Sequence, residues 1–229
     1  MGFLKQFFRN VFHDEMPART TSSFEQLTQD ELEAHLGVSR YGDFELSEAV
    51  RPSYGLEVVP TTGFRHDTYR DEQSHANVPV LMAAVSKEKT METFIALIEP
   101  LGDVVDVVLE SSHGQQGHGH TDLYREHIDL PILQSTLWDF EDLLLNDGCT
   151  GIAVLNPGIP QEVQLDEHKL LLVYGEDLLQ YENVLVDCHV PNRENIKFIT
   201  EAEHVHSTTE RYAQAFEELK VQLGMDGYR

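Results

Sequence analysis

The segment VLMAAVS, residues 80–86, is apolar almost throughout, and LLLVYG, residues 170–175, repeats this character in the second half of the chain. Neither segment alternates apolar and polar residues, which is typical of strands that are buried on both faces of a sheet. We therefore expect these two segments to be central strands, with the rest of the fold arranged around them.

The two segments belong to a longer similarity between the halves of the chain. YGLEVVPTTGF, residues 54–64, is similar to TGIAVLNPGI, residues 150–159. DVVLESSH, residues 106–113, is similar to KFITEAEH, residues 197–204, and the matches keep their order at nearly constant separation. Self-similarity at a fixed spacing is typical of a repeated supersecondary unit. The sequence therefore predicts an internal duplication.

Each repeat is predicted to be a β-β-α-β-α unit. The expected strands are 55–60, 79–86 and 103–111 in the first repeat, and 151–156, 162–174 and 195–201 in the second. The expected helices are 90–101 and 130–146, then 176–189 and a last one that begins at Ser207. Because a strand-helix-strand connection places two parallel strands in the same sheet, the prediction is an α+β (mixed α/β) fold. Its mixed sheet carries helices packed on it, and a pseudo-two-fold axis relates the repeats.

The chain divides into three ranges on this interpretation. Residues 1–23 form an N-terminal amphipathic helix and linker, residues 24–147 the first α/β repeat, and residues 148–229 the second, in one compact body. The apolar side chains of residues 1–12 recur at helical spacing, which suits a helix on the protein's own core, in a partner's groove or at a membrane surface. Thr28 and Glu31 form a capping box that predicts a helix ending before Gly37.

The charge of the chain narrows the classes of partner. With 40 acidic and 16 basic residues the formal net charge is −24, so nucleic acid, which is bound through clustered Lys and Arg, is not an expected partner. A protein with a basic surface is an expected partner. Alternatively, the acidic surface only keeps the protein soluble. Two cysteines, Cys149 and Cys188, and no apolar run near 18 residues predict a cytoplasmic protein without a transmembrane segment.

The histidine-rich loop 113–127 is the main difference between the repeats and carries the metal hypothesis. Glu110, His113, His118 and His120 are candidate ligands for a divalent metal such as zinc, which accepts three protein ligands and a water in catalytic sites. An His-x-His step on an extended chain points both rings the same way. His204 and His206, with Glu201 and Glu203, stand at the equivalent strand end and would complete a binuclear site.

Two functions from different classes remain open. The first is a non-enzymatic protein-interaction or regulatory module, because no nucleotide-binding loop or nucleophile elbow is present in the sequence. Such a protein could form a homo-oligomer. The alternative is a divalent-metal-dependent hydrolase that uses the loop 113–127. Asp166, Glu167 and His168 precede a central strand, where they indicate either a turn or a paired polar site, and the turn is favoured.

Overall fold

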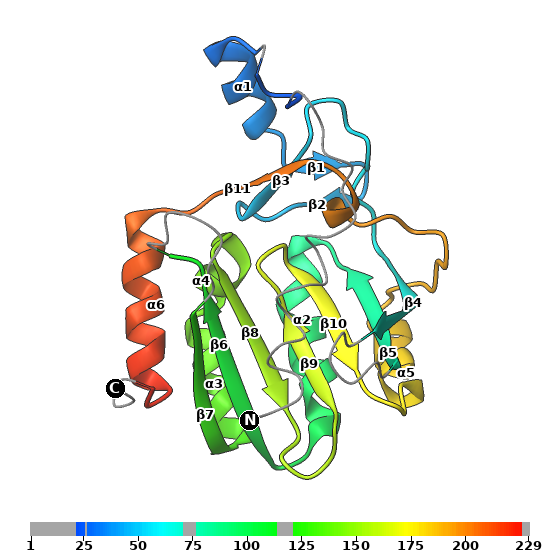
Figure 1. Ribbon diagram of the computed structural model, residues 1–229, viewed down its shortest axis with the longest axis vertical. Coiled ribbons are helices and arrows are strands. Elements are labelled where there is room, and N and C mark those ends of the chain that lie inside the picture. Colours follow the sequence, from blue (N-terminus) through cyan, green and yellow to red (C-terminus); the bar gives the residue numbers. More distant parts are fainter. Residues whose placement is uncertain (1–21, 26, 71–76, 114–120, 226–229) are drawn as a thin grey trace.

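The two apolar segments are neighbours in a seven-stranded sheet (Figure 1). The computed structural model describes residues 22–25, 27–70, 77–113 and 121–225. From one edge to the other, the strands are β4 (Gly63–Arg70), β5 (Asn77–Ala84), β10 (Leu170–Tyr174), β9 (Glu162–Leu165), β8 (Thr150–Leu155), β6 (Val104–Ser111) and β7 (Thr121–Asp129). The strands of the two predicted repeats thus share one sheet.

Every neighbouring pair in this sheet is antiparallel, so the predicted mixed sheet is wrong. The helix α2 (Lys87–Ile98) does connect two parallel strands, β5 and β6, as the strand-helix-strand pattern predicted. However, β10, β9 and β8 lie between these two strands. Because this antiparallel meander fills the space between them, the parallel strands never become neighbours.

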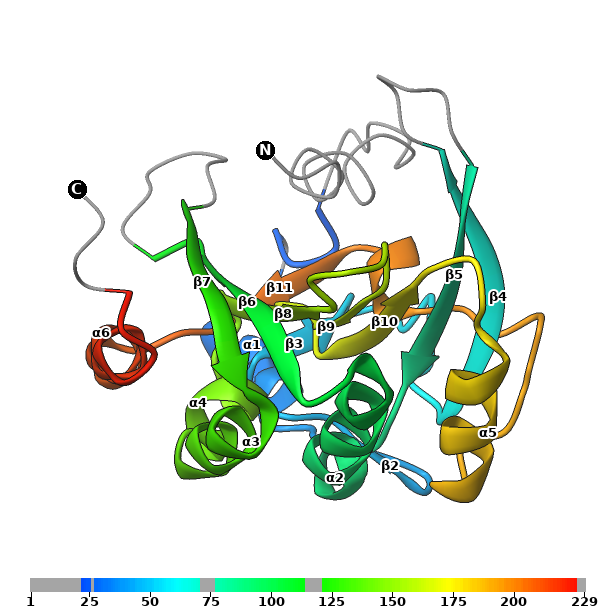
Figure 2. The ribbon, with the colours of Figure 1, turned by 90° about the horizontal axis from the view of Figure 1, so that it is seen from below.

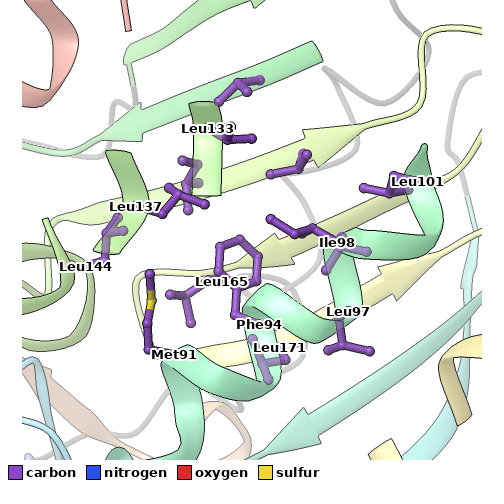
Figure 3. Close-up of a cluster of buried hydrophobic side chains, with 14 of the residues drawn as sticks. Met91, Phe94, Leu97, Ile98, Leu101, Leu133, Leu137, Leu144, Leu165 and Leu171 are labelled. Carbon is purple, nitrogen blue, oxygen red and sulfur yellow. The ribbon is translucent and has the colours of Figure 1, made fainter. Parts of the chain in front are cut away.

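Helices cover one face of the sheet, where the main core forms. Figure 2 shows α2, α3 (Leu130–Asp139), α4 (Glu141–Asn146) and α5 (Leu179–Asp187) beneath the strands, with α6 (Glu210–Gln222) beyond the β7 edge. Phe94 and Leu97 of α2 are fully buried against Leu165 and Leu171 of the sheet (Figure 3). Burying such side chains contributes about 2 kcal/mol each, so this face dominates the stability of the fold.

The second face of the sheet packs on residues from outside it. A smaller core joins Phe44, Leu46 and Val50 to Met82 and Leu172. Figure 1 shows four elements above the upper end of the sheet, namely α1 (Gln29–Leu36), β1 (Arg40–Tyr41), β2 (Phe44–Glu45) and β3 (Val50–Pro52). The short strand β11 (His204–His206) pairs antiparallel with β3. The polypeptide therefore returns, late in its sequence, to the segment that precedes the sheet.

Several predicted elements are confirmed. The Thr28–Glu31 capping box begins α1, which Gly37 ends. The predicted helix 130–146 is present as α3 and α4, with a break at Phe140. The helix expected to begin at Ser207 is α6, but Thr209 is its cap.

Three predicted strands are wrong. No strand spans residues 55–60, and β4 begins only at Gly63. The expected strand 162–174 is the hairpin β9–β10, which turns at residues 166–169. The expected strand 195–201 is absent: residues 195–198 form no strand, and Ile199–Glu201 is a 3-10 helix.

The structure does not confirm the internal duplication or its pseudo-two-fold axis. The first predicted repeat contains two antiparallel strand pairs, β4–β5 and β6–β7, on either side of α2 in the sequence. The second predicted repeat begins with the three-stranded meander β8–β9–β10. The predicted amphipathic helix in residues 1–12 lies outside the described residues. None of the helices in the described part of the chain combines the length and the hydropathy that crossing a bilayer demands.

Candidate metal centre

Three histidines converge at the end of the sheet where β11 passes over the β9–β10 turn. His168 lies in that turn, and His204 and His206 lie on β11. The ring centroids are 4.9 Å apart for His168 and His204, 4.6 Å for His168 and His206, and 5.2 Å for His204 and His206. One ligand atom of each ring lies within 4.8 Å of the other two. We call this group the three-histidine cluster.

The backbone explains why these three side chains meet. Residues i and i+2 of a strand point to the same face, so His204 and His206 project together from β11. The pairing of β11 with β3 fixes the position of both residues along the strand, because His204 lies opposite Pro52 and His206 lies opposite Val50. His168 approaches from the other side because the tight turn after β9 ends with Lys169 at a φ of 64°.

Each ring of the cluster is held through its Nδ1 atom. His168 Nδ1 lies 2.8 Å from Asp166 Oδ2. His204 Nδ1 lies 2.8 Å from the carbonyl of Ala202, and His206 Nδ1 lies 2.8 Å from that of Gly148. Carbonyl and carboxylate oxygens accept hydrogen bonds, so each of these Nδ1 atoms carries a proton, and the neutral form of each ring has its lone pair on Nε2. Metal-ligating histidines are oriented in this way by carboxylates and carbonyls.

Asp166 has two tasks in this arrangement. Its Oδ1 accepts a hydrogen bond from the backbone N–H of Leu170 at 2.7 Å, which closes the turn, and its Oδ2 holds His168. The turn that the sequence favoured at residues 166–168 is present, whereas the paired polar site would involve Asp71, Glu72 and His75, which lie outside the described residues. Asp166 is only 5 % exposed, so its interaction with the imidazole is shielded from solvent.

The electrostatics keep two of the imidazoles neutral. Desolvation, together with the neighbouring His168 and His204, lowers the pKa of His206 to about 3. Desolvation and His168 also lower the pKa of His204. The pKa of His168 is raised, because the charge and hydrogen bond of Asp166 outweigh the desolvation of the ring. Metal ions bind the neutral form of imidazole, which is therefore the form that His204 and His206 present at neutral pH.

A second polar group adjoins the cluster across Gly148. His113 Nε2 lies 3.1 Å from Asp147 Oδ2, and one ligand atom each of His113, Asp147 and Cys149 lie within 4.8 Å of one another. Burial, with the nearby Asp147 and Glu167 carboxylates, raises the pKa of the Cys149 thiol. An activated cysteine nucleophile requires a lowered thiol pKa, and His113 is already bonded to Ser111 and Asp147. The group is thus not arranged as a nucleophilic triad.

A third polar group, which we call the carboxylate strip, consists of Glu110, Glu162 and Gln164. Glu110 extends over Gly151, and its Oε2 accepts a hydrogen bond from Gln164 Nε2 at 3.1 Å. Burial, and then the charge of Asp122, raise the pKa of Glu110 to about 8. Glu162 is fully buried, and neither of its carboxylate oxygens has a hydrogen-bond partner among the described residues.

The residues that the sequence predicted as metal ligands do not form one site in the structure. His204 and His206 come together with His168, and His113 belongs to the second group. Glu110 lies in the carboxylate strip, while Glu201 binds Arg65 and Glu203 accepts a hydrogen bond from the Ser23 backbone. His118 and His120 lie outside the described residues, and part of the predicted loop is the strand β7. Sequence reasoning missed Asp147, Cys149 and His168 as ligand candidates; it considered His168 as part of a turn, which it favoured, or of a paired polar site.

Comparisons with known proteins add no assignment. No protein-family model, no curated protein and no solved structure matches this chain. The site is therefore interpreted from its own geometry.

Proposed function

We propose that this protein binds a divalent transition-metal ion, zinc foremost, through His168, His204 and His206. The observation that carries the proposal is the convergence of three rings that are each oriented by a hydrogen bond at Nδ1. Zinc lies about 2 Å from an imidazole nitrogen. Small rotations of rings whose ligand atoms are already within 4.8 Å of one another would therefore complete the coordination.

The surroundings favour a cation. Three neutral imidazoles leave the double positive charge of the ion uncompensated in the first coordination sphere. The buried carboxylate of Asp166, whose Oδ2 lies 2.8 Å from His168 Nδ1, places a negative charge beside the cluster. The net charge of −24 attracts cations at long range.

Such a site supports hydrolysis, which is the activity class we propose. Three histidine ligands leave a coordination position for water, and zinc lowers the pKa of that water to about 7. His206 is the most exposed of the three residues, so a small substrate would approach from its side. Asp166 would keep His168 in place during the reaction.

The test of metal binding is a titration of metal-free, untagged protein with zinc against a chromophoric chelator. The double variant His204→Ala, His206→Ala is expected to lose one equivalent of zinc and at least about 100-fold in affinity at this site. At a free zinc concentration of about 100 times Kd, the wild type should gain about 2.7 kcal/mol in free energy of unfolding, and the variant should not gain it from this site.

The matched control is the double variant His127→Asn, His189→Asn. Both histidines are exposed and have positive φ angles, which asparagine tolerates. This variant is expected to bind zinc like the wild type. Equal zinc binding by the wild type and the His204→Ala, His206→Ala variant would refute the site.

The substitution Asp166→Asn tests the orientation of His168. Its side-chain oxygen can still accept the hydrogen bond from Leu170, but its amide would face the proton on His168 Nδ1. We expect zinc affinity at the three-histidine cluster to fall 10- to 100-fold, which is about the range for lost outer-shell partners. Far-UV circular dichroism should stay unchanged, and an unaltered zinc affinity would contradict the role of Asp166.

The hydrolase class is tested separately with chromogenic carboxylate and phosphate esters. Zinc-dependent turnover that disappears in the His204→Ala, His206→Ala variant supports it, whereas zinc binding without turnover would leave a metal-binding protein that is not a hydrolase. The interaction module with a basic partner, the homo-oligomer and the contact of residues 1–12 with a membrane surface stay predictions from the sequence.

A further inference from the structure

The second polar group has the composition of a metal site of another kind. His113 follows β6, whereas Asp147 and Cys149 flank Gly148 between α4 and β8. The three residues offer a nitrogen, an oxygen and a sulfur atom within 4.8 Å of one another. Imidazole, carboxylate and thiolate are the three side-chain ligand types that zinc uses.

The ligands of this group are held by their surroundings. The Ser111 hydroxyl lies 2.9 Å from His113 Nδ1, and the ring packs against Phe216 with centroids 5.5 Å apart. These contacts direct His113 Nε2 toward Asp147 and Thr208. Outer partners that fix the ring of a ligand are characteristic of metal sites.

Asp147 supplies an independent indication. The residue has no exposed surface, and its Oδ2 accepts a hydrogen bond from the hydroxyl group of Thr150. Its Oδ1 is buried and has no hydrogen-bond partner among the described residues. Leaving a buried carboxylate oxygen without a partner is costly, and a cation bound by Asp147 would remove that cost.

We propose that His113, Asp147 and Cys149 bind a second divalent transition-metal ion. Binding releases the thiol proton to solvent, and the thiolate, the carboxylate and the neutral imidazole then compensate the charge of the ion. This site is thus electrically neutral, in contrast to the three-histidine cluster. Neutrality and partial burial suit an ion that joins the end of β6 to the segment before β8. The inference does not depend on metal binding by the three-histidine cluster.

Cobalt distinguishes the two sites, because only the second contains sulfur. Metal-free, full-length protein is titrated with Co²⁺ and its near-ultraviolet absorption is recorded. We expect two equivalents to bind and a thiolate-to-cobalt charge-transfer band to appear. The band should vanish in Cys149→Ser and remain in Cys188→Ser, a matched control because both cysteines are free and half-buried.

Further variants separate this proposal from the proposed function. The His204→Ala, His206→Ala variant should keep the charge-transfer band while it loses one equivalent of Co²⁺. His113→Ala should weaken the cobalt binding that gives the band at least about tenfold, and this variant serves if Cys149→Ser does not fold. No band in the folded wild type, or a band that survives Cys149→Ser or depends on Cys188, would overturn the second site.

Discussion

Replacing Gly148 by alanine is expected to lower the free energy of unfolding by about 3 kcal/mol. A Cβ atom at this buried position would lie 2.3 Å from the carbonyl oxygen of Ala49 and 2.9 Å from that of Ser207. Both are backbone atoms, so no side-chain rotation relieves the contact. The backbone hydrogen bonds from Gly148 to Ser207, and from Ser207 to Ala49, would have to lengthen.

The same substitution is expected to weaken metal binding at both proposed sites. The Gly148 carbonyl orients His206, and Asp147 and Cys149 are its neighbours in the chain. Urea unfolding followed by far-UV circular dichroism measures the stability, and the zinc and cobalt titrations measure the binding. Gly55→Ala is the control, because nothing lies within 4 Å of its added Cβ. A Gly148→Ala protein as stable as this control would refute the close approach.

The second large effect is a gain in stability from Glu162→Leu, which we expect to reach about 3 kcal/mol at pH 7. Glu162 is fully buried and its carboxylate has no hydrogen-bond partner among the described residues. Leucine has a similar volume and needs no partner. A buried polar group that destabilises the fold is typical of a residue retained for function, so the variant should also be assayed for metal-dependent activity.

The gain should increase with pH. Burial, and then the charge of Glu110, raise the pKa of Glu162 well above 4.5. Above pH 4.5 the unfolded chain therefore releases a proton that the folded chain keeps, and the wild type loses up to about 1.4 kcal/mol per pH unit through this group. Leucine does not titrate, so the Glu162→Leu variant lacks this pH-dependent loss in the free energy of unfolding. Urea unfolding at pH 5 and pH 7 measures the difference, with Glu126→Leu on the exposed face of β7 as a control expected to change little at either pH. A gain that is absent, or that shrinks with pH, would contradict the assignment.

The sequence predicted helices better than strands, because the signals for a helix are local. The Thr28 capping box and the apolar stripe of α2 act within one or two turns of helix. The sequence favoured a turn at residues 166–168, but the hairpin β9–β10 was still predicted as one strand because residues 166–169 contain neither glycine nor proline. Lys169 takes the positive φ there, and its flanking leucines made the segment resemble one long strand.

The candidate site was only half predictable, for a related reason. The His-x-His argument was made for His118 and His120, which lie outside the described residues. The same spacing places His204 and His206 on one face of β11. His168 joins them through the pairing of β11 with β3 and through the Gly148–Ser207 contact. These contacts connect residues that are distant in the sequence, and no spacing rule encodes them.

The pairing of β11 with β3 also bears on the order of events during biosynthesis. Residues 50–52 leave the ribosome before the strands of the sheet, whereas residues 204–206 follow only after all seven of these strands have been made. The nascent chain therefore cannot bring the three imidazoles together until every strand of the sheet has been synthesised. An ion bound by these imidazoles would therefore connect β11 to the β9–β10 turn only after the strands of the sheet have been synthesised.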